Sequence, residues 1–271
     1  MKKILLSSLL LPVSFIALSG CSNNSANESN KYNTEAIHQV SLLQGLMLGD
    51  YYGSVTVKEL KSMGNTGIGT FNSLNGELIL IDGICYRANE SLELEVVSDD
   101  ETVPFADVTF LDNDLSYELN GLNSIEELKS ILDSKVKELG TNRFYMIRID
   151  GLFDEIYFRS EKKQSLPYKP LNEVLKTDQT FKTMTNTNGS IVGLYTPNYM
   201  SDLNAVGWHF HFVTEDRRSG GHVLNADLGE CNITWDYTDS FNMYLPNGEF
   251  FNTLDLTVDQ DKAIKEVEQG N

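Results

Sequence analysis

Residues 207–213 have the sequence GWHFHFV and residues 220–222 have the sequence GGH, and together they hold three of the four histidines in the chain. Successive side chains of a strand point to opposite faces, so His209 and His211 share one face and the aromatic residues beside them share the other. The polar, glycine-ended run between the two segments predicts a chain reversal that sets His222 across a hairpin from His211. The sequence therefore predicts a two-strand unit with an apolar back and three imidazoles in front.

Three neutral imidazoles that converge from adjacent strands suit a catalytic zinc ion with one coordination position left for water or substrate. Solvated strand faces normally carry Lys, Glu, Thr and Ser, whereas imidazole is the commonest metal ligand. We therefore interpret His209, His211 and His222 as metal ligands rather than as the polar face of an exposed hairpin. The histidines alone do not define a reaction.

The first 20 residues have the composition of a secretory signal, because Lys2 and Lys3 precede an apolar run that ends in Leu-Ser-Gly before Cys21. This ending resembles the bacterial lipoprotein box, in which the cysteine becomes an acylated N-terminus, and several acyl chains anchor a protein stably. We predict a signal peptide over residues 1–20, lipidation at Cys21 and a flexible tether over residues 21–34. The protein is then an extracytoplasmic, membrane-anchored lipoprotein or a secreted protein.

The formal net charge of −18 over 271 residues limits the classes of partner. Loss of the signal removes two lysines and no acid, so the mature chain is still more negative. Such a surface argues against nucleic acid and anionic lipid head groups, which leaves membrane contact only through the N-terminal lipid. Cys85 and Cys231 could form one disulfide in an oxidising compartment, but they lack the paired spacing of a cysteine zinc site.

Apolar residues at helical spacing predict helices over residues 35–48 and 258–268. His38 lies off the apolar stripe of the first, so we expect it at the surface. Two further helices are predicted from capping boxes, a short one that opens at Thr56 and ends near residue 63, and one that opens at Ser124 and ends at Gly140.

Alternating patterns and turn residues predict most of the remaining chain as strands. Asp150-Gly151 is interpreted as the turn of a hairpin between two of them. The predicted strands are 67–71, 77–81, 84–87, 92–97, 108–110, 144–149, 152–158, 190–195, 208–213, 222–228, 233–237 and 241–245.

These elements predict a mixed α/β protein of the α+β class in two parts. Residues 35–163 would form an N-terminal domain with a mixed sheet and helices. Residues 164–271 would form a C-terminal metal-binding domain with a barrel-like antiparallel sheet and a terminal helix. The boundary is placed at the segment 164–170, which contains two prolines.

Several segments resemble the bacterial alpha-acetolactate decarboxylase family, in the family's order from about Ile37 to the last helix. They are residues 69–78 (GTFNSLNGEL), 159–164 (RSEKKQ) with Pro167-Tyr168, 193–197 (GLYTP), and the histidine segment 207–222. The histidine set and the Asn-Gly-Glu-Leu turn are the most specific of these. The resemblance implies that His209, His211 and His222 bind zinc, and it gives site roles to Glu77, Arg159 and Glu268.

Residue type supports these roles unequally. Glu77 follows an Asn-Gly turn at the start of a strand, where a carboxylate can project into a site. Arg159 closes an apolar strand and would by itself be a solvated strand end. Glu268 lies in the last helix among charged residues, and Glu266 is the competing assignment. Thr70 is a candidate for lining the substrate pocket, with core or turn packing equally compatible.

The implied reaction is the decarboxylation of (S)-2-acetolactate, a small 2-hydroxy-3-oxo acid, to (R)-acetoin, a step of acetoin and butanediol formation. The substrate ketone can accept the electron pair as an enediolate, and zinc would stabilise the charge as a Lewis acid. Arg159 offers a planar fork for the substrate carboxylate. Glu77 or Glu268 would then protonate one face of the enediolate. A homodimer is compatible with this function, and the sequence does not define the oligomeric state.

Two alternatives belong to other classes. The pattern His209-x-His211 with Glu215 resembles the first metal motif of cupin oxygenases and isomerases, but His222 follows too early for the second motif. A non-enzymatic, lipid-anchored zinc-binding protein would commonly carry low-complexity histidine tracts. Here the histidines are embedded in apolar strands, which favours the enzyme.

Overall fold

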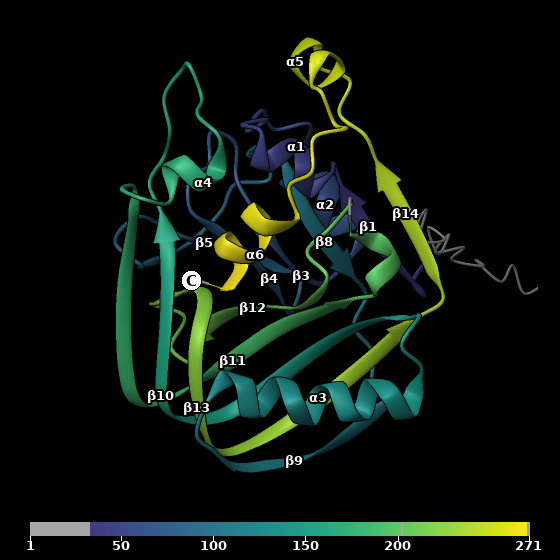
Figure 1. Cartoon of the computed structure of the whole chain (residues 1–271). Helices are drawn as coiled ribbons and strands as arrows, with labels where there is room; N and C mark the ends of the chain where they lie inside the picture. Colours follow the sequence, from purple (N-terminus) through teal and green to yellow (C-terminus); the bar gives the residue numbers. More distant parts are fainter. Residues whose placement is uncertain (1–32, 202, 270–271) are drawn as a thin grey trace, which may run out of the picture.

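The computed structural model of the protein describes residues 33–201 and 203–269, and it contains two β-sheets that pack against each other (Figure 1). The predicted signal peptide, the lipidation site Cys21 and most of the tether over residues 21–34 lie outside these ranges and stay predictions. Among the helices of the described ranges, none has both the length and the apolar character needed to cross a membrane.

The first sheet has seven strands in the order β14-β1-β8-β3-β4-β5-β6. Strands β14 and β1 are parallel, and the other neighbours are antiparallel. Strands β3 to β5 form the predicted meander, which is confirmed. The bounds are β1 (Ala36–Val40), β3 (Thr66–Thr70), β4 (Glu77–Ile81), β5 (Ile84–Ala88), β6 (Leu94–Val96), β8 (Phe105–Thr109) and β14 (Ser240–Tyr244).

The second sheet has the order β10-β11-β12-β13-β9, and β10 also pairs with β13. Strand β10 is thus bonded along both edges, so the sheet curls around its own core. The predicted barrel is not confirmed. The bounds are β9 (Leu115–Leu122), β10 (Phe144–Glu161), β11 (Gln179–Thr196), β12 (Gly207–Thr214) and β13 (Gly220–Thr238), and a separate small ladder pairs β2 (Val55–Thr56) with β7 (Thr102–Val103).

The two capped helices begin where the sequence predicts. The side chains of Thr56 and Ser124 accept hydrogen bonds from the third residue of their helices, Glu59 and Glu127, and Gly140 ends the longer helix. That longer helix, α3, lies against β9 and β13 (Figure 1), and its buried side chains belong to the core of the second sheet. The helices are α1 (Leu43–Met47), α2 (Val57–Met63), α3 (Ile125–Leu139), α4 (Leu171–Val174), α5 (Glu249–Thr253) and α6 (Asp261–Gln269), with a 3₁₀ turn at Asn198–Met200.

The two sheets share an apolar core, to which Ile68 and Ile79 contribute from the first sheet and Met146, Val192 and Val213 from the second. They do not divide at residue 164, because β9 and β10 lie in the second sheet before that residue and β14 returns to the first sheet after it. Segment 164–170 is instead a connection from β10 towards α4. Its prolines mark a loop, and loop composition does not tell a crossover within a sheet from a linker between domains.

The predicted helix over residues 35–48 is wrong for its first half. Residues 36–40 form β1, which is buried along its whole length between β14 and β8, and only residues 43–47 are helical. A strand covered on both faces lacks polar alternation, so its apolar positions also fit a helical spacing. The expectation that His38 is exposed is wrong for the same reason, since only 1% of its surface is accessible.

The predicted hairpin at Asp150-Gly151 is also wrong, because β10 runs without a turn from residue 144 to residue 161. A Cβ atom at Gly151 would lie 2.3 Å from the carbonyl oxygen of Glu230, so the glycine admits the close approach of β13. The sequence left open whether Cys85 and Cys231 pair, and they do not. Cys85 and Cys231 are free, buried residues of different cores.

Candidate active site

Strands β12 and β13 place the three histidines together. His211 lies directly opposite His222 in the register of the two strands, as the hairpin prediction requires. Phe210 and Phe212 point to the other side, into the core of the second sheet. The alternation of β12 therefore anchors one face in apolar packing and leaves the other face for His209 and His211.

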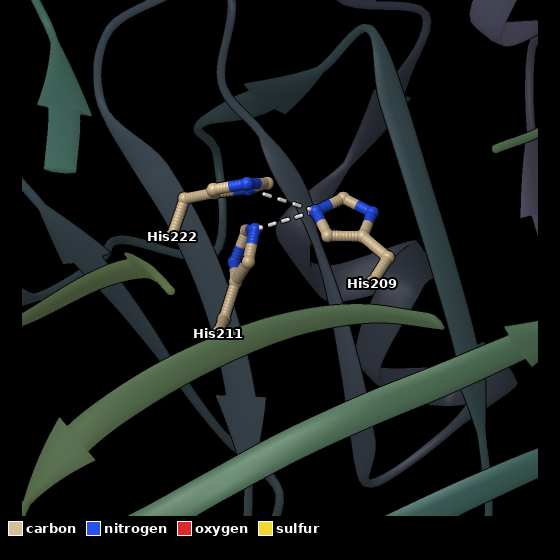
Figure 2. A group of neighbouring side chains, drawn as sticks. All are labelled: His209, His211 and His222. Atoms are coloured by element: carbon tan, nitrogen blue, oxygen red, sulfur yellow. Dashed lines mark hydrogen bonds between the residues drawn. The ribbon is translucent and has the colours of Figure 1, made fainter. Parts of the chain in front are cut away.

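The three imidazoles converge on one point (Figure 2). The Nε2 atom of His209 lies 3.1 Å from Nε2 of His211 and 3.1 Å from Nδ1 of His222. Zinc–nitrogen bonds of about 2.0–2.1 Å put two ligands of a tetrahedral ion roughly 3.3 Å apart. The observed spacing is thus close to that of a three-histidine metal centre.

Backbone carbonyls orient two of the rings. Nδ1 of His211 donates to the carbonyl oxygen of Leu78 in β4 over 2.9 Å, and Nε2 of His222 donates to that of Glu268 in α6 over 3.1 Å. A carbonyl only accepts, so the hydrogen of each neutral ring lies on the nitrogen that faces away from the centre. The lone pairs of His211 Nε2 and His222 Nδ1 consequently point inward.

Burial keeps these rings neutral. It lowers the pKa of His209 to about 3, with the positive charges of Arg159 and Lys129 adding to the effect. Burial likewise lowers the pKa of His211 and His222 well below the ordinary value. Neutral imidazole is the form that binds a metal ion.

Two carboxyl groups lie beside the histidines. An oxygen of Glu77 is 3.4 Å from Nε2 of His211, and an oxygen of Glu268 is 3.4 Å from Nε2 of His209. Glu77 begins β4, whereas Glu268 comes from α6. The competing residue Glu266 is exposed and pairs with Lys262 at 3.7 Å, so Glu268 is the glutamate that α6 turns to the histidines.

Both of these carboxyl groups have raised pKa values. Burial raises the pKa of Glu268 to about 7 against the opposing charges of Arg159 and Lys129. Burial and the charge of the neighbouring Glu161 raise the pKa of Glu77 well above its ordinary value. Glu268 is therefore able to hold a proton near neutral pH, and Glu77 keeps its proton to higher pH than an exposed glutamate does.

Arg159 lies in β10 directly opposite His222, so the strand register brings it to the same site. Its side chain is buried, and one terminal nitrogen donates to the carbonyl oxygen of Val267 over 2.9 Å. Its Nε atom has no partner within the described residues. Thr70 lies opposite Glu77 at the end of β3, so the structure brings every predicted site residue of the described chain to one place.

One residue of the site was not predicted from the sequence. Glu161 is 3% exposed, and one of its oxygens accepts a hydrogen bond from Thr70 over 3.1 Å. The sequence prediction ended the strand at residue 158 and gave Glu161 no role, although it lies in the segment 159–164 that resembles the family. Because β10 continues to residue 161, Glu161 lies on the same face as Arg159, and the two-residue spacing was the pattern that would have found it.

The cavity between these groups is small, about 40 Å³. A water molecule needs about 10–15 Å³ of such space, so the cavity has room for an ion and a few waters rather than for an organic acid. Helix α6 lines one side of it through Val267 and Glu268. Apolar side chains complete the wall, namely Leu43, Leu46, Leu74, Phe105, Leu171 and Leu175.

Inward-facing neutral imidazoles, protonatable carboxyl groups and a buried arginine in a closed pocket define a candidate metal-dependent enzyme for a small anionic molecule. Comparisons with known proteins are consistent with an enzyme of this class. The sequence model of the family described as Alpha-acetolactate decarboxylase matches residues 37–258. The chain belongs to the alpha-acetolactate decarboxylase family, which confirms the predicted resemblance and the prediction of a decarboxylase.

Individual relatives support this membership over most of the chain. The alpha-acetolactate decarboxylase of Bacillus subtilis is 36% identical over 86% of this chain and 89% of its own length. That of Methanosarcina mazei is 35% identical over 87% of this chain and 81% of its own length. The crystal structure of the enzyme from Bacillus subtilis strain 168 superposes with a TM-score of 0.83 at 35% identity and covers 86% of this chain and 99% of that one.

Proposed function

We propose that this chain is a zinc-dependent enzyme that converts (S)-2-acetolactate to (R)-acetoin and carbon dioxide. The observation that carries the proposal is the convergence of three imidazole nitrogens beside Glu77, Glu268 and Arg159. The acetolactate specificity is supported by the family to which the chain belongs. The cupin and non-enzymatic alternatives have no such support.

The residues present fit a zinc ion held by His209, His211 and His222. His209 Nε2 carries at most one hydrogen, so the three inward nitrogens do not fully satisfy one another. The Glu268 oxygen beside His209 is also buried without a hydrogen bond among the described residues. Unpaired buried polar atoms are costly, and their concentration here favours a bound ion. When bound, zinc supplies Lewis acidity to the ketone and hydroxyl oxygens of the substrate.

Arg159 binds the substrate carboxylate in this proposal. Its Nε atom and its terminal nitrogens form the planar fork that matches a carboxylate. When the bond between the carboxyl carbon and its neighbour breaks, neutral carbon dioxide leaves and the electron pair stays on the substrate as an enediolate. The apolar wall of Leu74, Phe105 and Leu171 favours this loss of a charged group, because it removes water from the carboxylate.

Glu77 and Glu268 are the candidates for the group that then protonates the enediolate carbon. Both have raised pKa values and lie beside the histidines. Glu161 strengthens the case for Glu77, since two neighbouring buried carboxyl groups are not easily ionised together and one of them keeps a proton. A proton delivered from a fixed side gives acetoin of one handedness.

We infer that α6 shifts on substrate entry, because it lines this small cavity through Val267 and Glu268 and the cavity is too small for the substrate. The hydrogen bonds that would open join Arg159 to the carbonyl oxygen of Val267 and His222 to that of Glu268. Opening thus exposes the arginine that receives the substrate carboxylate.

The test is to supply the zinc-loaded protein with racemic acetolactate and to follow acetoin and carbon dioxide. We expect turnover of one enantiomer, loss of turnover after chelation and its return with stoichiometric zinc measured by metal analysis. Turnover no faster than spontaneous decarboxylation contradicts the proposed reaction. Full turnover in metal-free protein contradicts the zinc dependence alone.

A further inference from the structure

A second group of carboxylates lies on other elements than the histidine site. Asp112 and Asp114 belong to the connection between β8 and β9, and Asp236 lies near the end of β13. One carboxylate oxygen from each residue belongs to a set in which no two atoms are more than 4.8 Å apart. The three acids come from segments more than a hundred residues apart in the sequence, so tertiary structure alone assembles them.

Backbone hydrogen bonds hold the connection against β13 on both sides of Asp236. The amide of Asp114 donates to the carbonyl oxygen of Trp235 over 3.0 Å. The amide of Tyr237 donates to a carboxylate oxygen of Asp114 over 3.1 Å. The acids are thereby fixed close together although their like charges repel.

Asp236 is the buried member of the group, with 1% of its surface exposed. Its Oδ2 atom has no hydrogen-bond partner in the described part of the chain. Burial, followed by the carboxylates of Asp112, Asp114 and Glu35, raises its pKa to about 8. A buried carboxylate with an unpaired oxygen among other acids is unfavourable unless a proton or a cation balances it.

We propose that Asp112, Asp114 and Asp236 bind a calcium ion. All three oxygens lie within 4.8 Å of one another, so one hard cation can contact them all. Calcium takes six to eight oxygen ligands in flexible geometry and is often held by several protein carboxylates, whereas magnesium keeps several waters and is usually held by one or two carboxylates. Zinc and copper favour nitrogen and sulfur ligands, which this group does not offer.

The surroundings can complete the coordination. Asp112 and Asp114 are exposed, which leaves the outer side open to water ligands. Thr238 follows Asp236 by two positions, on the same face of β13, and its buried hydroxyl has no partner in residues 33–201 and 203–269. The ion would join the end of β13 to the connection that leads from the first sheet to the second.

The experiment measures thermal unfolding of the zinc-loaded full chain in calcium or magnesium chloride. A site occupied at about a hundred times its dissociation constant raises the midpoint by on the order of 5 °C for a chain of this size. We expect this shift with millimolar calcium and a smaller shift with magnesium. Terbium, a luminescent cation of similar size and ligand preference, should bind there and be sensitised by Trp235 and Tyr237.

The double variant Asp112→Asn/Asp114→Asn should lose the calcium shift and the terbium signal. It keeps two exposed amides of similar size, so folding is preserved. The variant Asp100→Asn/Asp154→Asn removes two exposed acids elsewhere and should keep both responses. Equal calcium shifts and terbium signals in the two variants overturn the proposal. Absence of both responses in the unmodified protein also overturns the proposal.

Discussion

His38 and His211 are equally buried, each with 1% of its surface exposed, yet their surroundings differ. Both ring nitrogens of His38 have partners from the protein, the hydroxyl of Tyr244 at 2.9 Å and the carbonyl oxygen of Asn33 at 2.9 Å. Nδ1 of His211 donates to the carbonyl oxygen of Leu78, and its Nε2 faces the imidazoles of His209 and His222. Burial alone therefore does not distinguish a structural histidine from a metal ligand.

The position of the ring hydrogen distinguishes His38 from His211. The carbonyl of Asn33 accepts from Nε2 of His38, so Nδ1 of that ring is left to accept from the hydroxyl of Tyr244. The lone pair of His38 Nδ1 therefore already accepts a hydrogen bond from the protein itself. Among the three rings, only His209 can offer a hydrogen to the inward lone pairs of His211 and His222, and it offers at most one, which leaves a lone pair available to an ion.

The largest effect is expected for His211→Ala. The variant should lose stoichiometric zinc and at least about 10³-fold in turnover, because two histidines hold the ion poorly and the Lewis acid is worth several kcal/mol. Metal analysis and the acetolactate assay measure the two losses. The matched control is His38→Gln, which should keep both; a variant of His211 that retains zinc and full activity removes this residue from the ligand set.

The next effect concerns the proton donor. Replacement of the donating glutamate by glutamine should lower turnover by about 10²–10⁴-fold, the usual contribution of general acid catalysis. Its remaining acetoin should be racemic, since solvent would protonate either face. Chiral chromatography of the product from Glu77→Gln and from Glu268→Gln identifies the donor. Acetoin of unchanged handedness from both variants shows that neither side chain delivers the proton.

Arg159→Ala is expected to have a smaller effect, with zinc retained and kcat/KM reduced by roughly 10- to 100-fold through the lost charge-assisted hydrogen bonds, worth about 1.5–3 kcal/mol. Arg159→Lys should recover part of this loss, because it keeps the charge without the planar fork. Metal analysis beside steady-state kinetics separates the roles. Loss of zinc in the alanine variant instead points to Arg159 as a structural support of the centre.

The smallest effect on activity is expected for His38→Gln, which should lower stability instead. His38→Gln should cost about 1–3 kcal/mol near pH 8 through its lost hydrogen bonds, with turnover unchanged. Burial lowers the pKa of His38, against the opposing hydrogen bond to Asn33. Folding then favours the neutral ring, and this stability is lost as the pH falls below about 6.5, where the unfolded ring binds a proton.

Urea unfolding of the unmodified protein and of His38→Gln between pH 8 and pH 5 tests this pH dependence. The difference in free energy of unfolding between the unmodified protein and His38→Gln should shrink as the pH falls. A difference that grows towards acid pH contradicts the neutral assignment of His38.

The sequence by itself determined the features that depend on neighbours a few residues apart. Strand alternation was sufficient to place His209 and His211 on one face, and the register confirms His222 opposite His211. The capping residues of α2 and α3 act within one helical turn, and both helix starts are confirmed, with a complete capping box at Thr56 and only its N-cap half at Ser124. The family resemblance identified Glu77, Arg159 and Glu268 as site residues, and the structure brings these side chains together.

Only the tertiary structure decided what depends on contacts between distant segments. The choice of Glu268 over Glu266 follows from how α6 packs over the pocket, and Glu161 joins the site because β10 extends further than its local pattern shows. Strand β1 is a strand because β14 and β8 supply its hydrogen bonds, although its own residues also suit a helix. Backbone pairing and burial override local preference wherever a segment is enclosed on both sides.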